Sequence, residues 1–190
     1  MRVINSSFLN KALILALMAA APLAAQDGKF RFGGQLSFAS PIGDLSNVAS
    51  AGFGAALLGE MALDENFAIR GRLDYNSFGE KDILVFKSSM SAFGVAADAV
   101  YYINGGSTGL FVLATAGIAN WTWKLKMDAP GVNFSESDNT VGLSYGVGAG
   151  YNFNKNFGAE AKYMNGPSLS SDSLDDKGTN YFTVSLTYRF

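Results

Sequence analysis

The chain has 190 residues, of which 48% are hydrophobic and 16% charged, with a formal net charge of −2 and neither cysteine nor histidine. This length suits one domain of ordinary size, and the slightly acidic charge argues against a nucleic-acid partner. Without cysteine no disulfide framework supports the fold, and without histidine the usual general base is missing. Stability must come from packing or from a membrane.

Residues 1–25 have the layout of a secretory signal peptide. Arg2 and Lys11 precede the apolar run ALILALMAAA, and small residues follow it up to Gln26. The run is about half the roughly 20 residues that a spanning helix needs, so an uncleaved anchor is the less favoured alternative. We predict cleavage after Ala25 and an exported mature chain, residues 26–190, that forms a single domain.

The mature chain contains no apolar run of 18 or more residues, which excludes a helical membrane protein. Instead, alternation with period two recurs in segments of about ten residues, the pattern expected of a membrane β-barrel. Eight strands are predicted, at residues 29–38, 53–63, 67–75, 91–103, 110–124, 141–153, 157–163 and 181–190.

In each predicted strand one set of alternate positions is apolar or small, and the charged residues fall on the other set. On the fifth strand the apolar set is Phe111, Leu113, Ala119, Trp121 and Trp123. The last strand, YFTVSLTYRF, alternates most regularly and ends on Phe190. The charges predicted to share the polar face are Arg31, Glu60, Arg70, Arg72, Asp74, Asp98, Lys124, Glu160, Lys162 and Arg189.

Short connections alternate with long ones along the chain. The short ones are residues 64–66, 104–108 and 154–156, and the long ones are residues 39–52, 79–90, 125–140 and 164–180. Short turns at one end and long loops at the other are typical of outer-membrane barrels. Centring the turns on Glu65 and Lys155 predicts that Glu60 faces Arg70 and that Lys162 faces Gly148.

Alternation alone leaves two orientations open: an apolar core, as in a secreted lipocalin-like binder, or an apolar wall in lipid. Aromatic residues of the apolar face gather at the strand ends, and this sorting is typical of the two interfacial girdles of a membrane wall. We therefore predict that the apolar face points outward. The predicted girdles are Phe30, Phe67, Tyr101, Phe111, Phe153, Phe157 and Phe190 at one end, and Phe53, Tyr75, Phe93, Trp121, Trp123, Tyr163 and Phe182 at the other.

The chain resembles the small eight-stranded outer-membrane barrels of Gram-negative bacteria, the OmpX type and the OmpA transmembrane domain, and more generally the outer membrane protein β-barrel domain family. The stretches that carry this resemblance are the leader, GKFRFGGQLSFASPIGDLS, NFAIRGRLDY, VGLSYGVGAGYNFNKNFGAEAKY and YFTVSLTYRF. The resemblance implies an all-β, antiparallel up-and-down transmembrane barrel in the outer membrane, with short periplasmic turns and longer extracellular loops. It also implies that the barrel-assembly machinery reads the C-terminal strand with Phe190.

No catalytic, cofactor-binding or metal site is predicted. The barrel acyltransferase and deacylase families of the lipopolysaccharide layer rely on a histidine-containing site, which this chain cannot form. Asp74 with Asp98 or Glu60 could in principle serve as acid and base. A buried network with the basic residues is the favoured interpretation, since the ten inward charges comprise six positive and four negative ones. Eight strands leave room only for side chains or one small ligand, so a plugged lumen is expected.

Two further stretches have a structural and a functional interpretation. GVGAG, residues 146–150, lacks the helix that a phosphate-binding loop needs, so we interpret it as part of a strand. Asp172, Asp175 and Asp176, in the acidic loop 165–178, could hold a divalent cation or lie near cation-bridged lipopolysaccharide. A solvated loop is the simpler interpretation.

The sequence thus predicts a monomeric outer-membrane barrel that is no enzyme and that contacts membrane lipid and lipopolysaccharide. Its role is structural, or an interaction at the cell surface through the long loops. The alternatives are a narrow channel or binding site for a small solute, for example an apolar one, and, as a third class, a lipid-modifying enzyme.

Overall fold

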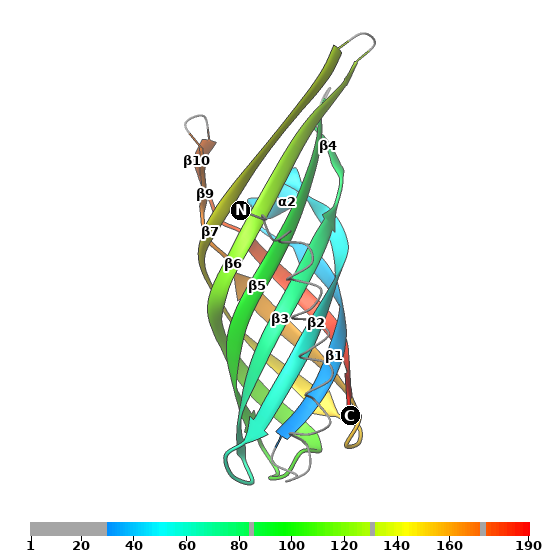
Figure 1. Cartoon of the computed structure of the whole chain (residues 1–190), viewed down its shortest axis with the longest axis vertical. Helices are drawn as coiled ribbons and strands as arrows, with labels where there is room; N and C mark the ends of the chain where they lie inside the picture. Colours follow the sequence, from blue (N-terminus) through cyan, green and yellow to red (C-terminus); the bar gives the residue numbers. More distant parts are fainter. Residues whose placement is uncertain (1–29, 84–85, 130–131, 172–173) are drawn as a thin grey trace, which may run out of the picture.

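The computed structural model describes residues 30–83, 86–129, 132–171 and 174–190, in which strands form a cylinder with a long hairpin rising from one end (Figure 1). The predicted leader lies outside these residues. The strands are β1 (Phe30–Pro41), β2 (Ser50–Ala62), β3 (Phe67–Gly79), β4 (Lys81–Ile83), β5 (Phe86–Tyr102), β6 (Gly109–Ala129), β7 (Val132–Asn152), β8 (Phe157–Asn165), β9 (Leu169–Ser171), β10 (Leu174–Lys177) and β11 (Asn180–Arg189). One helical turn, α2 (Leu45–Val48), connects β1 to β2.

The cylinder closes because its first and last strands pair. The sheet order is β3-β2-β1-β11-β8-β7-β6-β5-β4, and a further pairing of β3 with β5 completes the ring. In the β1–β11 seam, Leu36 lies opposite Leu186 and Gly33 opposite Arg189. The predicted eight-stranded antiparallel barrel, with YFTVSLTYRF as its closing strand, is confirmed. β4 extends the sheet beside β5, and β9 and β10 form a separate two-stranded ribbon.

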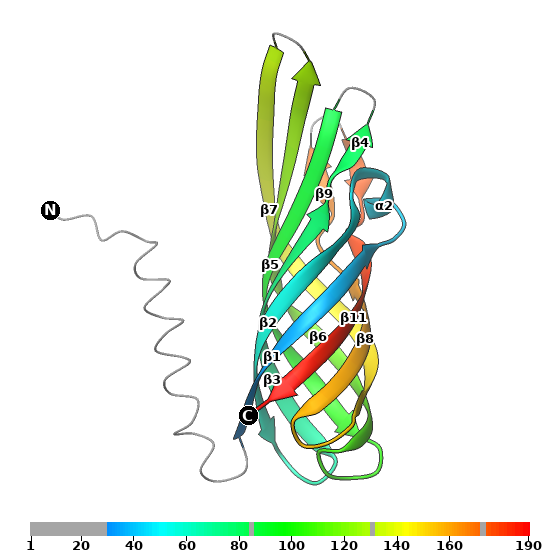
Figure 2. The same cartoon turned by 90° about the vertical axis from the view of Figure 1, so that its right-hand side faces the viewer.

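The short turns lie at the end of the barrel where β1 begins and where the chain ends (Figure 2). Two of them have the same internal hydrogen bonds. Asp64 Oδ1 accepts from the N–H groups of Asn66 and Phe67, at 2.7 Å each. Asn154 Oδ1 accepts from Asn156 and Phe157, at 2.9 and 2.8 Å. These tight turns fix the register of the hairpins, and Glu60 does lie opposite Arg70 and Lys162 opposite Gly148.

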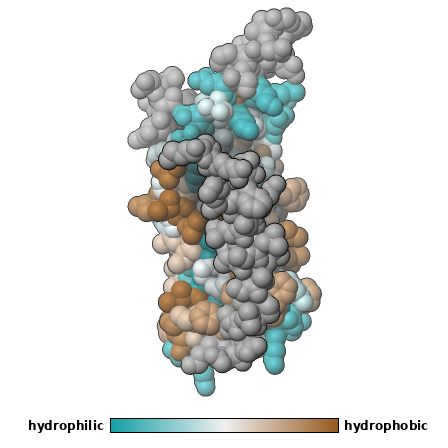
Figure 3. All heavy atoms as spheres, viewed as in Figure 1, coloured by the Kyte–Doolittle hydropathy of each residue, from teal (hydrophilic) through white to brown (hydrophobic). Residues whose placement is uncertain are grey.

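The outside of the cylinder is apolar. Leu36, Phe53, Leu143 and Leu186 are between 67% and 74% exposed. Figure 3 shows hydrophobic residues over the middle of the visible wall and hydrophilic ones gathered near the loop end. So large an exposed apolar surface is unfavourable in water and favourable in lipid. Among the described residues, no helix has the length and apolar character needed to cross a membrane.

The predicted facing of the fifth strand is wrong. Phe111, Leu113 and Trp121 on β6 are buried inside the barrel, and the set of positions that faces outward contains Val112 and Ile118. Phe111 and Trp121 therefore belong to the lumen and to no girdle, and Trp123 is half-buried on the same inner face. Lys124, predicted to lie in the lumen, is exposed beyond the membrane wall. The prediction failed because both faces of β6 are apolar, so the apolar residues alone do not show which face points toward lipid.

The predicted loop 125–140 is also wrong, because most of it is strand. β6 and β7 remain paired from Gly109 opposite Asn152 to Ala129 opposite Val132, well beyond their neighbours. The paired strands form the hairpin that projects from the loop end of the barrel in Figures 1 and 2. The other long connections also contain short elements: α2 in 39–52, β4 in 79–90, and β9 and β10 in 164–180.

Candidate functional site

The candidate site is the interior of the barrel, which alternate residues of the strands fill. Because side chains alternate between the two faces of a strand, an apolar outer set brings the polar set inside. Seven of the inward charged residues, from five strands, are almost wholly buried. They are Glu60 on β2, Arg70 and Arg72 on β3, Asp98 on β5, Glu160 and Lys162 on β8, and Arg189 on β11.

Arg70 is the centre of this network. Its Nε donates to Asp98 Oδ2 at 2.8 Å, and its Nη2 forms an ion pair with Glu160 Oε2 at 2.9 Å. Lys162 Nζ lies 2.7 Å from the other oxygen of Glu160, and Thr115 Oγ1 donates to Asp98 Oδ1 at 2.7 Å. A buried charge is tolerated when it is paired: Asp98 is both paired and hydrogen-bonded, and each oxygen of Glu160 faces a cation.

Toward the short-turn end, Glu60 is the centre of a second group of hydrogen bonds and ion pairs. Its Oε1 accepts from Arg31 Nη2 and from the hydroxyl of Tyr102, both at 2.7 Å. Arg189 Nη2 lies 3.9 Å from Glu60 Oε2. Below them, aromatic and aliphatic side chains close this end of the lumen. That inner apolar cluster consists of Ala68, Val100, Tyr102, Phe111 and Leu113.

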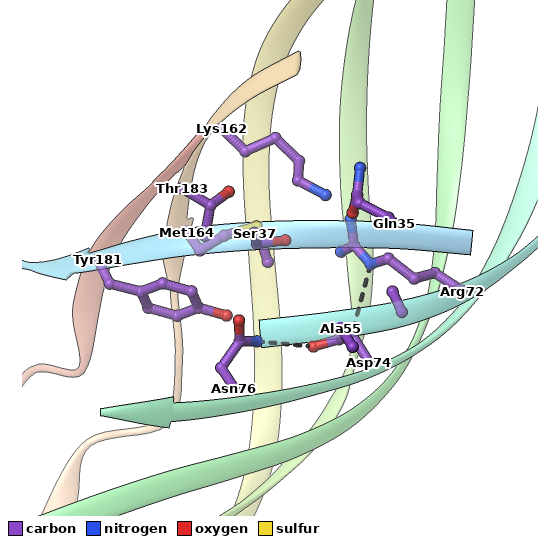
Figure 4. Close-up of a pocket in the computed structure, with 11 residues that line it drawn as sticks. Gln35, Ser37, Ala55, Arg72, Asp74, Asn76, Lys162, Met164, Tyr181 and Thr183 are labelled. Atoms are coloured by element: carbon purple, nitrogen blue, oxygen red, sulfur yellow. Dashed lines mark hydrogen bonds and ion pairs between the residues drawn. The ribbon is translucent and has the colours of Figure 1, made fainter. Parts of the chain in front are cut away.

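Toward the loop end, Arg72 Nε lies 3.2 Å from Asp74 Oδ1, and Asn76 Nδ2 donates to Asp74 Oδ2 at 3.1 Å. Beside them Figure 4 shows a small cavity, into which Lys162 and Thr183 also point. The centre of a water molecule can occupy about 20 Å³ of it, which is room for one or two waters. On the residues that line this cavity, Thr183 Oγ1 and Arg72 Nη1 are buried without a hydrogen-bond partner.

An aromatic layer covers the cavity on its outer side. Phe78 and Trp121 stack with their ring centroids 5.5 Å apart, and the edge of Tyr181 meets both rings at 5.5 and 5.6 Å. Leu45 of α2 packs into the same layer. The lumen is therefore ordered along its axis as apolar cluster, ion-pair network, small cavity and aromatic layer.

This geometry changes what the sequence-predicted residues can do. Asp74, Asp98 and Glu60 each contact an arginine, so they form no bare acid and base pair. Gly148 and Gly150 lie opposite Lys162 and Glu160 in a strand, as interpreted from GVGAG. Within the described ranges, no group of three or more acidic, histidine or cysteine residues could hold a metal. Asp172 lies outside the described residues.

Sequence reasoning placed the interior residues Thr115 and Trp121 on the lipid-facing set, and it did not single out Gln35 and Tyr102, which are also interior. Thr115 carried a usable signal, because it is a polar residue in the middle of a set that was predicted to face lipid. Gln35 and Tyr102 carried the signal of alternation, since they share the predicted inward sets of Arg31 and Asp98.

A closed antiparallel cylinder with an apolar wall and an ionic interior defines a transmembrane β-barrel of the outer-membrane class. Residues 12–190 match the family described as outer membrane protein beta-barrel domain, and the chain belongs to that family. The predicted family and the predicted location in the outer membrane are thereby confirmed. No curated protein matches the chain.

Several solved structures share the fold at low sequence identity. Ail, the attachment invasion locus protein of Yersinia pestis, is 20% identical with a TM-score of 0.55, covering 85% of this chain and 96% of Ail. Ail has also been solved with the heparin analogue sucrose octasulfate. The N-terminal barrel domain of Pseudomonas aeruginosa OprF is 16% identical with a TM-score of 0.56, covering 84% of this chain and 97% of that domain. A major outer membrane protein of Thermus thermophilus is 14% identical with the same TM-score, covering 85% and 99%.

Proposed function

We propose that the protein is a sealed outer-membrane barrel that acts through what its extracellular end binds, and that it passes no solute. The observation that carries this proposal is the network around Arg70, which joins β3 to β5 and β8 across the lumen. An ion moving through the barrel would have to separate buried pairs, and removing one partner of such a pair costs about 3–5 kcal/mol. The two apolar layers add further barriers to a hydrated ion.

The experiment is single-channel recording of the purified protein in planar lipid bilayers. A sealed barrel gives no steady conductance above the bare bilayer. A steady conductance that persists through repeated purification overturns the proposal and favours the alternative of a narrow channel. Replacing Arg70 in such a preparation and observing a changed conductance would place the current in this lumen.

A binding site for a small solute is the second candidate, and the cavity beside Arg72 is the place where such a solute would bind. About 20 Å³ suits water, and two atoms of residues that line the cavity, Thr183 Oγ1 and Arg72 Nη1, are buried without a hydrogen bond and suit a bridging water. We therefore assign the cavity to ordered water. A solute that raises the melting temperature of the parent protein and leaves that of Thr183→Val unchanged would reverse this assignment.

The extracellular end supplies the surface for an interaction. The β6–β7 hairpin and the β9–β10 ribbon both extend from the end opposite the short turns, where Figure 3 shows hydrophilic residues. We propose that these elements meet lipopolysaccharide and ligands outside the cell, that Phe190 and its strand engage the barrel-assembly machinery, and that the protein is a monomer. We expect no enzymatic turnover, because the acidic residues of the lumen are held in ion pairs.

A further inference from the structure

The outward-facing residues of β5, β6 and β7 lie in rows that cross the three strands. From one row to the next toward the loop end, these rows change from apolar to polar. One row contains Val95, Ile118 and Leu143, all more than half exposed. The row after next, toward the loop end, contains Ser91, Thr122 and Asn139. Because these residues share the outward face, the change marks the outer limit of the hydrocarbon layer on this wall.

Three exposed lysines follow directly on the same face. Lys124 lies between Ser89 and Ser137 in the next row, and Lys126 lies opposite Lys87 in the row after that. We call Lys87, Lys124 and Lys126 the lysine patch. All three belong to one continuous sheet, so their relative positions are fixed by strand register.

The patch has a surplus of positive charge. The positions opposite Lys124 are serines on both sides, and Lys126 faces Lys87, a like-charge arrangement that destabilises a sheet. Asp82 on β4 lies opposite Lys87, and Asp128 follows Lys126 by two residues on β6, so three lysines are set against two acidic residues and one positive charge is left over. Glu136 and Asp138 on β7 alternate with Ser137 and therefore belong to the opposite face of the hairpin. An anion seated beside Lys124 and Lys126 would relieve the repulsion.

The height of the patch fits the headgroups of the outer leaflet. Lys124 lies four residues beyond Asn120, which is paired with Phe93 of the aromatic girdle. Four residues span about 13 Å along the strand, or about 10 Å in height at a tilt near 40°. The headgroup layer adds about 5–8 Å to each side of the hydrocarbon core. The flexible stem of a lysine lets its ammonium group reach back into that layer.

We propose that the lysine patch binds the phosphate groups of the anionic glycolipid of the outer leaflet, lipopolysaccharide. The inference rests on the proposed surface-interaction role and deepens it by naming a site and its ligand chemistry. A membrane ligand is favoured over a soluble polyanion because the patch faces sideways and continues the lipid-facing wall. The neighbouring serine hydroxyls supply further donors to phosphate oxygens.

The test compares lipid A binding to the parent protein and variants in phosphatidylcholine nanodiscs, measured by native mass spectrometry over a titration. The probes are bisphosphorylated lipid A and the same lipid A with both phosphates removed. We expect tighter binding of the phosphorylated form, about fivefold weaker binding for Lys124→Gln, and a larger loss for the double variant K124Q/K126Q. Lys155→Gln, which removes one exposed charge at the short-turn end, is the matched control and should bind like the parent.

Folding of each variant is checked by its heat-dependent shift in gel mobility, and K124R/K126R, which keeps the charge, should retain binding. Equal binding of the parent and K124Q/K126Q, or equal affinity for both lipid forms, overturns the inference. Lysine-dependent binding of sucrose octasulfate without binding of lipid A also overturns it and indicates a soluble polyanion. A closed lumen in the bilayer recordings together with unchanged lipid A binding contradicts this inference alone.

Discussion

Arg70 on β3 and Glu160 on β8 form an ion pair across the lumen, with Nη2 and Oε2 2.9 Å apart and both side chains buried. The two strands are not neighbours in the sheet, so the pair joins opposite walls of the barrel. Main-chain hydrogen bonds hold each strand to the next, whereas this contact spans the interior, whose width the closed ring of strands sets. Arg70 thus links β3 to the opposite wall of the barrel as well as to its neighbour β5.

Replacing Arg70 by methionine should lower the free energy of unfolding by about 3–5 kcal/mol, because Asp98 and Glu160 lose their shared partner while staying buried. The measurement is urea unfolding of the barrel in lipid vesicles, followed by tryptophan fluorescence. Arg70→Lys keeps the charge and should lose less. If the Arg70→Met variant were as stable as the parent, the network would contribute nothing net.

The aromatic layer gives a prediction that separates stability from closure. Trp121 is buried between Phe78 and Tyr181, so Trp121→Ala should cost about 3–5 kcal/mol through the cavity that it leaves. Trp123→Ala is the matched control, since Trp123 is only half-buried, and its loss should be smaller. The W121A barrel should still show no steady conductance, because the Arg70 network lies beneath the layer. A W121A variant that conducts would identify the aromatic layer as the seal.

The strands of this fold could be predicted from the sequence wherever charges mark one face. Arg70, Arg72 and Asp74 label the inner face of β3 without ambiguity, and hairpin geometry then pairs Arg70 with Glu60. On β6 no charge within the membrane marks the inner face, and both faces are apolar. Leu110 and Val112 face lipid, while Phe111 and Leu113 fill the lumen. The charged residue on which that strand's predicted facing rested, Lys124, lies beyond the hydrocarbon layer, where an outward charge is tolerated.

The projecting hairpin was missed for a related reason. Where the hairpin projects from the barrel, both faces of β6 and β7 meet water, so their sequences need no apolar alternation. The sequence pattern of such strands cannot be distinguished from that of a loop. The lumen contacts could be predicted only in part. Register predicts which residues are opposite on neighbouring strands, but the meeting of Arg70 with Glu160 depends on the diameter of the closed ring.

Gly148 should be intolerant of a side chain. A Cβ atom placed there would lie 2.5 Å from Cγ of Lys162, so Gly148→Val must displace the lysine from Glu160. We expect a large loss of folded barrel, measured as the fraction showing the heat-dependent gel shift after refolding. Ala149→Val on the next, lipid-facing position adds comparable bulk and should refold like the parent. Equal refolding of the two variants would contradict the tight fit.

The two similar turns allow a paired comparison. Asp64→Ala and Asn154→Ala each remove an oxygen that accepts two backbone N–H groups. Each should lower the free energy of unfolding by about 1–3 kcal/mol, with Asp64 at the upper end because its acceptor is ionised. Glu65→Ala and Lys155→Ala change the exposed central residues of the same turns and should stay within about 0.5 kcal/mol of the parent. If the two controls lowered the free energy of unfolding as much, the composition of the turns, and not their hydrogen bonds, would determine the stability of the hairpins.

Phe190 tests whether the last residue serves assembly or stability. Its N–H donates to Phe32 O, while its ring is 74% exposed to the membrane and contacts Tyr188. Phe190→Ala keeps the backbone bond, so the refolded barrel should unfold within about 1 kcal/mol of the parent, since lipid replaces most of the lost contacts. In living cells the amount of folded protein in the outer membrane should fall several-fold, if the assembly machinery reads this residue. Phe157→Ala, at another exposed girdle position, is the control and should reach the membrane at the parental level. Equal membrane levels of the two variants would remove Phe190 from the assembly signal, and a large loss of stability in F190A would explain a lower level without any recognition.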